Sequence, residues 1–154
     1  SSLASDRKCR SARGRRPDQL NPEPTMTEIQ VVETNQAPKA IGPYSQAIVA
    51  KGMVHCSGQG GMDPATGESV SDGVEGQTEQ CLRNLRAVLQ AAGTGFGRAV
   101  RCTVYLADLG DFAKVNLIYG KVFEGLTPPS RACVEVSALP KGARVEIDCI
   151  ALTD

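Results

Sequence analysis

The sequence predicts an α+β fold in which a mixed β-sheet carries two helices on one face. The chain has 154 residues, of which 41% are hydrophobic, and this suits one domain built around one core. Segments with strand-like alternation and segments with helical spacing follow in the order β-β-β-α-β-α-β-β. Because each strand pattern has one apolar side, two helices packed on the same face of the sheet would bury those sides.

Three strands and a glycine-rich loop are predicted before the first helix. Residues 29–33 form a short predicted strand. Residues 45–50 and 53–57 flank Lys51-Gly52, a dipeptide typical of a hairpin turn. Residues 58–67 are rich in glycine but lack the GxxxxGK[ST] pattern, so they are not a phosphate-binding loop.

The first helix has the clearest pattern in the chain. Apolar residues recur at helical spacing over residues 74–92. Asp72 and Glu75 have the spacing of a capping box, which predicts the start of the helix at this point. Gly93 is a natural C-terminal stop.

A second helix is predicted to begin at Asp111, as its cap, and to end before Pro128-Pro129. Its apolar face comprises Phe112, Val115, Tyr119, Val122 and Phe123. Asn116 interrupts that face, and an amide buried there must find hydrogen-bond partners. Those partners would be backbone groups at an interface or a ligand.

Three further strands are predicted at residues 98–106, 130–136 and 144–150, with a turn at 139–142 between the last two. Each has an apolar side for the core. The other side carries a mixed set, namely Arg101, Thr103, Tyr105, Arg131, Cys133, Glu135, Arg144, Glu146 and Asp148. A solvated face would carry more Lys and Glu and no Cys or Tyr. We therefore expect a subunit interface there, with a ligand site as the alternative.

Residues 1–25 differ from the rest of the chain and are excluded from the predicted domain, residues 26–154. They hold six basic and three acidic residues, a net charge of +3, so the remainder carries −3. This leader is interpreted either as an organellar presequence or as a segment foreign to the protein. The domain is expected in the cytoplasm, or in a mitochondrion or plastid if the leader is a presequence.

Composition argues against several classes of function. No run of about 18 apolar residues is present, which argues against a membrane partner. The acidic body lacks the basic surface typical of nucleic-acid binding. The six cysteines are widely spaced without a CxxC pair, and His55 is the one histidine, so neither a metal site nor a disulfide framework is expected. No cofactor is expected either.

Arg131 and Glu146 are the candidate catalytic residues. A guanidinium held on a strand matches a carboxylate through two parallel hydrogen bonds, although a salt bridge to Glu135 or Glu146 explains it as well. Glu146 would orient and activate a water, with a paired interface carboxylate as the alternative. Cys133, two residues after Arg131, is interpreted as a pocket wall rather than a nucleophile, because no Cys-His pairing is evident.

Several motifs together resemble the RidA/YjgF family of imine deaminases, in one register over about residues 27–152. The first three are Ala40-Ile41-Gly42-Pro43-Tyr44-Ser45-Gln46-Ala47, Cys56-Ser57-Gly58-Gln59 and Asp63-Pro64-Ala65-Thr66-Gly67-Glu68. The others are residues 111–116 (DFAKVN), residues 129–136 (PSRACVEV) and residues 139–147 (LPKGARVEI). Their combination is specific, although none is so alone.

The resemblance implies a chorismate-mutase-like fold, assembled as a homotrimer whose sheets face a central barrel and whose sites lie in the clefts between subunits. It implies hydrolysis of 2-imino acids and enamines, such as 2-aminoacrylate released by pyridoxal-phosphate enzymes, to 2-oxo acids and ammonia. Arg131 is implied to anchor the substrate carboxylate and Glu146 to position water. The implied substrate-binding residues are Tyr44, Ser57, Gly58, Asn116, Ala132 and Cys133.

One departure from the family pattern concerns the site loop. Many relatives carry an apolar residue and proline after Ser-Gly-Gln, where this chain has Gly60-Gly61. Substrate preference is therefore open. Two alternatives to the deaminase are an endoribonuclease or translation inhibitor, and a ligand-binding or chaperone-like module that has lost the chemistry.

Overall fold

A computed structural model describes residues 28–153 of the chain. The predicted leader, residues 1–25, lies outside the described residues. The strands are β1 Gln30–Val32, β2 Ala47–Ala50, β3 Met53–Gly60, β4 Ala99–Leu106, β5 Ser130–Glu135 and β6 Val145–Leu152. The helices are α1 Val74–Ala91 and α2 Phe112–Val122. This is the predicted order of elements.

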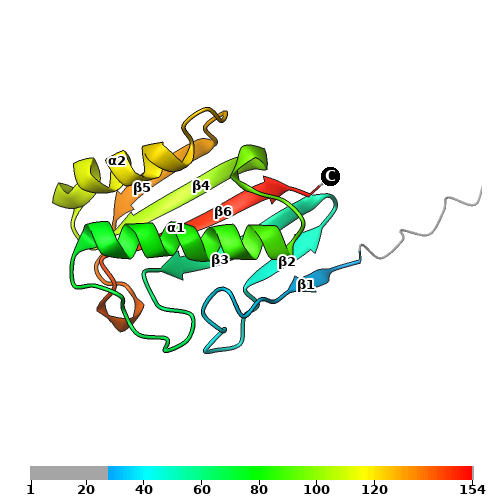
Figure 1. The fold of residues 1–154 in the computed structure, drawn as a ribbon, viewed down its shortest axis with the longest axis horizontal. Coiled ribbons are helices and arrows are strands. Elements are labelled where there is room, and N and C mark those ends of the chain that lie inside the picture. Colours follow the sequence, from blue (N-terminus) through cyan, green and yellow to red (C-terminus); the bar gives the residue numbers. More distant parts are fainter. Residues whose placement is uncertain (1–27, 154) are drawn as a thin grey trace, which may run out of the picture.

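The six strands form one sheet in the order β1-β2-β3-β6-β4-β5. β4 and β5 are parallel and every other neighbouring pair is antiparallel, so the sheet is mixed. The parallel pair follows from the crossover through α2, since a helix between two strands returns the chain to the same end of the sheet. Both helices lie on one face, and the opposite face stays open within the chain (Figure 1).

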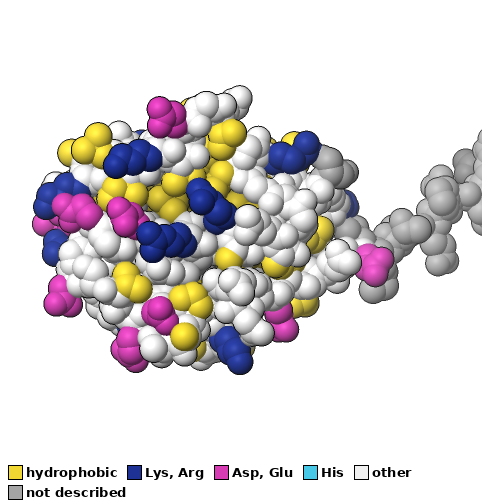
Figure 2. Space-filling view, in the orientation of Figure 1, with side chains coloured by type: hydrophobic (Ala, Val, Ile, Leu, Met, Phe, Trp, Pro, Cys, Tyr) yellow, Lys and Arg dark blue, Asp and Glu magenta, His cyan; other side chains and the backbone are white. Residues whose placement is uncertain are grey.

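The hydrophobic core lies between the helices and the sheet. α1 contributes residues such as Leu85 and Leu89, which are fully buried. Alternate residues of β4 and β6 meet them, for example Val104 opposite Ile147. On the outer surface of the helix layer, basic and acidic side chains are interspersed rather than gathered into one basic patch (Figure 2). No helix in residues 28–153 is long and apolar enough to cross a membrane.

The predicted turns are confirmed, but the two helix caps differ from prediction. Lys51 and Gly52 both have positive φ, as a tight hairpin turn requires, and Gly93 has a φ of +79° just after α1. The N-cap of α1 is Gly73, without a side-chain cap, so the capping box at Asp72 is wrong.

Asp111 does lie at the N-cap of α2, but its side chain makes no cap hydrogen bond. It instead accepts a hydrogen bond from Arg144 at 2.9 Å. A nearly buried carboxylate is better satisfied by a guanidinium than by a backbone amide. Arg144 thus links the start of β6 to the start of α2, and its guanidinium is engaged in this structural ion pair.

Candidate active site

Glu146 lies on β6 and points to the face of the sheet that the helices leave open. Its strand neighbours Val145 and Ile147 are fully buried on the helix side, so alternation sends Glu146 the other way. Its carboxylate lies against the backbone of Gly58 on β3, where a Cβ would overlap it. Gly58 therefore leaves the space that the Glu146 carboxylate occupies.

A β-bulge in β3 presents Gly58 to Glu146. Cys56 pairs with Cys149, but the next paired residue, Gln59, lies opposite Ile147, so β3 has one residue more than β6 here. The Ser57 hydroxyl, beside the bulge, donates to the Ser45 carbonyl at 2.6 Å. Ser57 thereby joins β3 to the segment before β2, and its hydroxyl hydrogen is engaged inside the fold.

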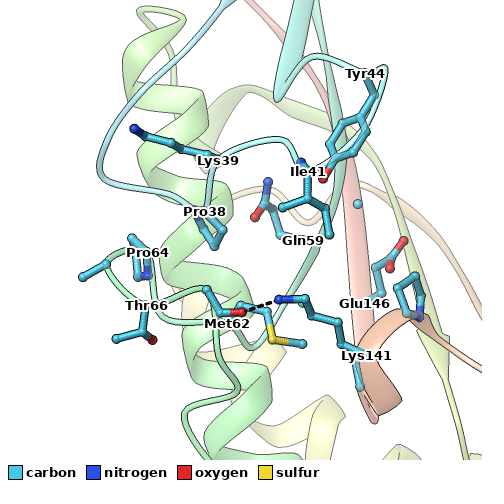
Figure 3. Close-up of a pocket in the computed structure, with 16 residues that line it drawn as sticks. Pro38, Lys39, Ile41, Tyr44, Gln59, Met62, Pro64, Thr66, Lys141 and Glu146 are labelled. Carbon is cyan, nitrogen blue, oxygen red and sulfur yellow. Dashed lines mark hydrogen bonds between the residues drawn. The ribbon is translucent and has the colours of Figure 1, made fainter.

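Glu146 and Gly58 line a cavity of about 380 Å³, and Tyr44 lines it from the segment before β2. Figure 3 shows Tyr44, Ile41 and Glu146 toward one end of this cavity and Pro64 and Thr66 toward the other. The Tyr44 side chain is about half exposed, and its hydroxyl accepts a hydrogen bond from the Ile41 amide at 3.4 Å. Tyr44 is thus a pocket wall and does not cap the core.

The pKa of Glu146 is raised. The main cause is burial, and the negative charge of Asp148, two residues along the same face, adds to it. Among the described residues Glu146 takes part in no salt bridge. Asp148 is held differently, since it accepts hydrogen bonds from the Thr103 amide and the Tyr105 hydroxyl. Glu146 is therefore a half-buried carboxylate that forms no salt bridge within residues 28–153, and its raised pKa makes it a candidate for proton transfer.

Arg131 lies on the edge strand β5 and packs against α2. Its guanidinium carbon is 4.7 Å from the centroid of the Tyr119 ring and 5.7 Å from that of Phe112. Such stacking holds a guanidinium in place without using its hydrogen-bond donors. No salt bridge within residues 28–153 involves Arg131, so the alternative of a structural ion pair with Glu135 or Glu146 is not seen in the chain.

Arg131 and Glu146 lie on opposite faces of the sheet. In the parallel register, Arg131 lies beside Cys102 and Cys133 beside Val104, and both of these β4 residues are buried under the helices. Residues paired across strands point to the same side, so Arg131 and Cys133 are on the helix side. The prediction that they share a face with Glu146 is wrong.

The alternation of β5 predicts that its apolar residues face the core, and the structure places them on the opposite face. β5 is an edge strand, and Val134 is exposed on the open face. On the helix side, Glu135 accepts a hydrogen bond from the Leu109 amide at 2.8 Å. The polar side of this strand thus packs beneath the start of α2.

The remaining predicted residues lie on α2 or on β5, and they do not line the cavity. Cys133 is half-buried, and burial raises the pKa of its thiol more than Arg131 lowers it, which supports a wall over a nucleophile. Asn116 is exposed on α2, so the prediction of a buried amide is wrong. The buried residues of that helix are Val115 and Tyr119, and Phe112 is exposed as well. Ala132 is half-buried beside Thr103.

The sequence did not reveal two buried amides that hold the cavity walls. Gln46 donates to the carbonyls of Thr34, Ala37 and Pro38, which fixes the loop ahead of Tyr44. Asn84 of α1 donates to the carbonyls of Gly60 and Met62, which fixes the opposite wall. Asn84 interrupts the apolar face of α1 and Gln46 directly precedes the apolar run of β2, and these positions were the available signal.

Comparisons with known proteins agree with the fold and the motifs. A family model described as Endoribonuclease L-PSP matches residues 34–153. Protein DfrA of Myxococcus xanthus is 55% identical over 124 residues, which are 79% of this chain and 94% of that protein. The human 2-iminobutanoate/2-iminopropanoate deaminase is 48% identical over 122 residues, 79% of this chain and 88% of that protein.

A solved structure gives the same fold. The YjgF gene product of E. coli has a TM-score of 0.78 at 41% identity, covering 81% of this chain and 99% of that one. Its fold confirms the predicted mixed sheet with two helices. The matched residues include both the cavity around Glu146 and the strand of Arg131. The chain therefore belongs to the RidA/YjgF family, whose model carries the Endoribonuclease L-PSP description.

Proposed function

We propose that this protein hydrolyses 2-imino acids, formed when pyridoxal-phosphate enzymes release enamines, to 2-oxo acids and ammonia. The observation that carries the proposal is the Glu146 carboxylate, half-buried in a cavity without a cationic partner and with a raised pKa. A carboxylate in that state can accept a proton from water and return it to a leaving amine. Relatives named 2-iminobutanoate/2-iminopropanoate deaminase support the same reaction.

The reaction needs a placed water and a base that shuttles protons. Glu146 takes a proton from water as its oxygen attacks the imine carbon, the C=N π electrons move to nitrogen, and Glu146 returns the same proton to that nitrogen. The product of this step is a carbinolamine beside an ionised Glu146. Glu146 then takes the hydroxyl proton as the carbonyl forms and gives it to the amine nitrogen as the C–N bond breaks, so ammonia leaves and Glu146 is ionised again. Gly58 leaves room for the carboxylate beside the backbone of β3, where it would face a water and a substrate bound in the cavity.

Arg131 supplies the substrate anchor in this proposal, and it does so from a second copy of the chain. Within one chain Arg131 and Glu146 point away from each other on opposite faces of the sheet, so they cannot act on one small substrate. A homotrimer that buries the open face would bring the helix-side edge of one copy to the cavity of the next. Asn116, Ala132 and Cys133 would then complete the wall opposite Tyr44, Ser57 and Gly58.

The test uses imines generated from L-amino acids by an amino acid oxidase. We expect purified protein to speed the loss of the imine, measured by competition with semicarbazide trapping, and to release ammonia faster. Glu146→Gln should lose this activity while keeping the wild-type oligomer in sedimentation. Binding of a 2-oxo acid without any turnover would contradict the deaminase and favour a ligand-binding module.

RNA serves as the control substrate, since the matching family model is described as an endoribonuclease. The charges on the helix face are mixed in sign, which does not favour binding to a phosphate backbone (Figure 2). We expect no salt-sensitive cleavage by a preparation free of contaminants. Cleavage that a Glu146→Gln substitution abolishes would replace the proposal.

A further inference from the structure

The cavity beside Glu146 has more room than the methyl side chain of a small 2-imino acid needs. A methyl group is close in size to a water molecule, whose share of liquid volume is about 30 Å³. It would fill less than about a tenth of the 380 Å³ available. Cavities of a few hundred Å³ are the size that proteins use for whole small-molecule ligands. The space therefore suits a substrate with a longer side chain.

Gly60 leaves this space open at a position beside Glu146. In the sheet, Gly60 of β3 is paired with Glu146 of β6, so a side chain at residue 60 would project from the same face as the carboxylate. A Cβ there would lie 3.7 Å from Met62 Cε and 3.9 Å from Ala143 Cβ, both in the cavity wall. The φ of Gly60 is not positive, so its backbone does not require glycine.

The side chains nearest Gly60 are apolar, and a hydrogen bond joins two loops of the cavity wall. Ile41, Met62 and Ala143 present hydrocarbon to the cavity. The Lys141 ammonium donates to the Gly67 carbonyl at 2.8 Å and so ties the turn before β6 to the loop after β3 (Figure 3). A preformed apolar wall binds hydrocarbon without a cost for ordering the loops.

We infer that the protein acts on 2-imino acids with branched or long apolar side chains, and that Gly60 sets this specificity by leaving the cavity open beside Glu146. The inference rests on the proposed function. With the carboxylate held by the Arg131 fork and the imine carbon beside Glu146, the side chain is the part of the substrate that remains to enter the cavity. Gly60 is a specificity-determining residue and takes no part in proton transfer.

The test compares imines derived from leucine and alanine. Wild type should have a kcat/KM for the leucine-derived imine at least equal to that for the alanine-derived one. Gly60→Val fills the cavity and should lower the leucine-to-alanine ratio of kcat/KM by at least about 10-fold, since each methylene-sized change in an apolar pocket is worth that order. Gly60→Ala, whose Cβ makes ordinary contacts, should lower it less.

Gly95→Val is the matched control, because a Cβ at Gly95 meets nothing within 4 Å and Gly95 lies outside the cavity. It should leave the ratio unchanged. A second measurement is inhibition by 2-oxo acids. Gly60→Val should weaken inhibition by 4-methyl-2-oxopentanoate more than inhibition by pyruvate. An equal loss on both substrates, or a wild type that strongly prefers the alanine-derived imine, overturns the inference. Failure of wild type to hydrolyse any imine overturns the proposed function itself.

Discussion

The two halves of the candidate site differ in how complete they are within one chain. Around Glu146 the fold supplies a cavity, and Gly58 leaves the space that the Glu146 carboxylate occupies. Around Arg131 it supplies a guanidinium stacked on Tyr119 and Phe112 at the edge of the sheet, outside any cavity shared with Glu146. The Glu146 half is a formed pocket within one chain. The Arg131 half is a stacked guanidinium that needs the surface of a second chain to form a pocket. The sheet therefore separates the two groups that the proposed chemistry must combine.

The largest effect should come from Arg131. Arg131→Ala should lower kcat/KM at least about 100-fold, because truncating one partner of a buried charge pair costs several kcal/mol. Steady-state rates on an enzymatically generated imine measure this, with the oligomer checked by sedimentation.

Arg86→Ala is the control for the Arg131 substitution. Arg86 also stacks on an aromatic ring, 5.8 Å from the centroid of Phe96, but it lies on the outer face of α1. It should keep wild-type rates. Full activity in Arg131→Ala would remove Arg131 from the site and leave the Glu146 half to account for substrate binding alone.

A smaller loss is expected from Gly58→Ala. The added methyl overlaps the Glu146 carboxylate, which is the end of a flexible side chain and can move aside. Folding should therefore survive, while the displaced carboxylate lowers kcat by about 10- to 100-fold. Thermal unfolding and kcat measured on the same sample separate the two effects. Unchanged kcat would show that the position of Glu146 against Gly58 does not matter.

Gly61→Ala should show the opposite pattern to Gly58→Ala, with a loss of stability in place of a loss of kcat. A Cβ at Gly61 would overlap the backbone of Gln77 on α1, which cannot move aside as a side chain can. We expect a loss of stability of about 1–3 kcal/mol, as for overpacking in a core. Denaturant unfolding measures it. Stability equal to wild type would indicate that α1 and the loop after β3 are less tightly packed than the structure shows.

The smallest effect concerns pH and stability. Burial raises the pKa of Glu146 in the folded protein, so the folded state binds its proton more tightly than the unfolded state does. Ionising Glu146 therefore costs stability as pH rises from the ordinary carboxyl range through the raised pKa. Glu146→Gln should raise Tm at pH 7 by less than the roughly 4 °C that 1 kcal/mol gives, because the group is partly exposed.

The gain from Glu146→Gln should disappear at a pH below the ordinary carboxyl pKa, where both states of the wild type are protonated. Thermal unfolding across pH shows this directly. A gain that persists in acid would mean that lost packing or hydrogen bonding, and not the charge, is responsible.

Much of the fold could be predicted from the sequence because local patterns determine it. The apolar periods of α1, β4 and β6 and the Lys51-Gly52 turn needed no tertiary information. The direction of the β5 side chains could not be predicted from the sequence, because alternation shows two sides but not which side faces the helices. That choice depends on the pairing of Arg131 with Cys102.

The resemblance to the family implied candidate site residues, but single-chain patterns did not predict how these residues are placed. Asn116 looked buried because the apolar period of α2 covers it, whereas the helix lies at the edge of the sheet and leaves it exposed. The role of Gly58 depends on a bulge that only the register reveals.

In the proposed mechanism Arg131 and Glu146 act together across two copies of the chain. Co-expression of Arg131→Ala with Glu146→Gln gives mixed oligomers, some of whose sites draw an intact Arg131 and an intact Glu146 from different subunits. Random assembly in equal amounts predicts about a quarter of wild-type activity from two inactive variants. Arg131→Ala co-expressed with the double variant should stay inactive. Activity of the first mixture no higher than that of the separate variants would contradict the account.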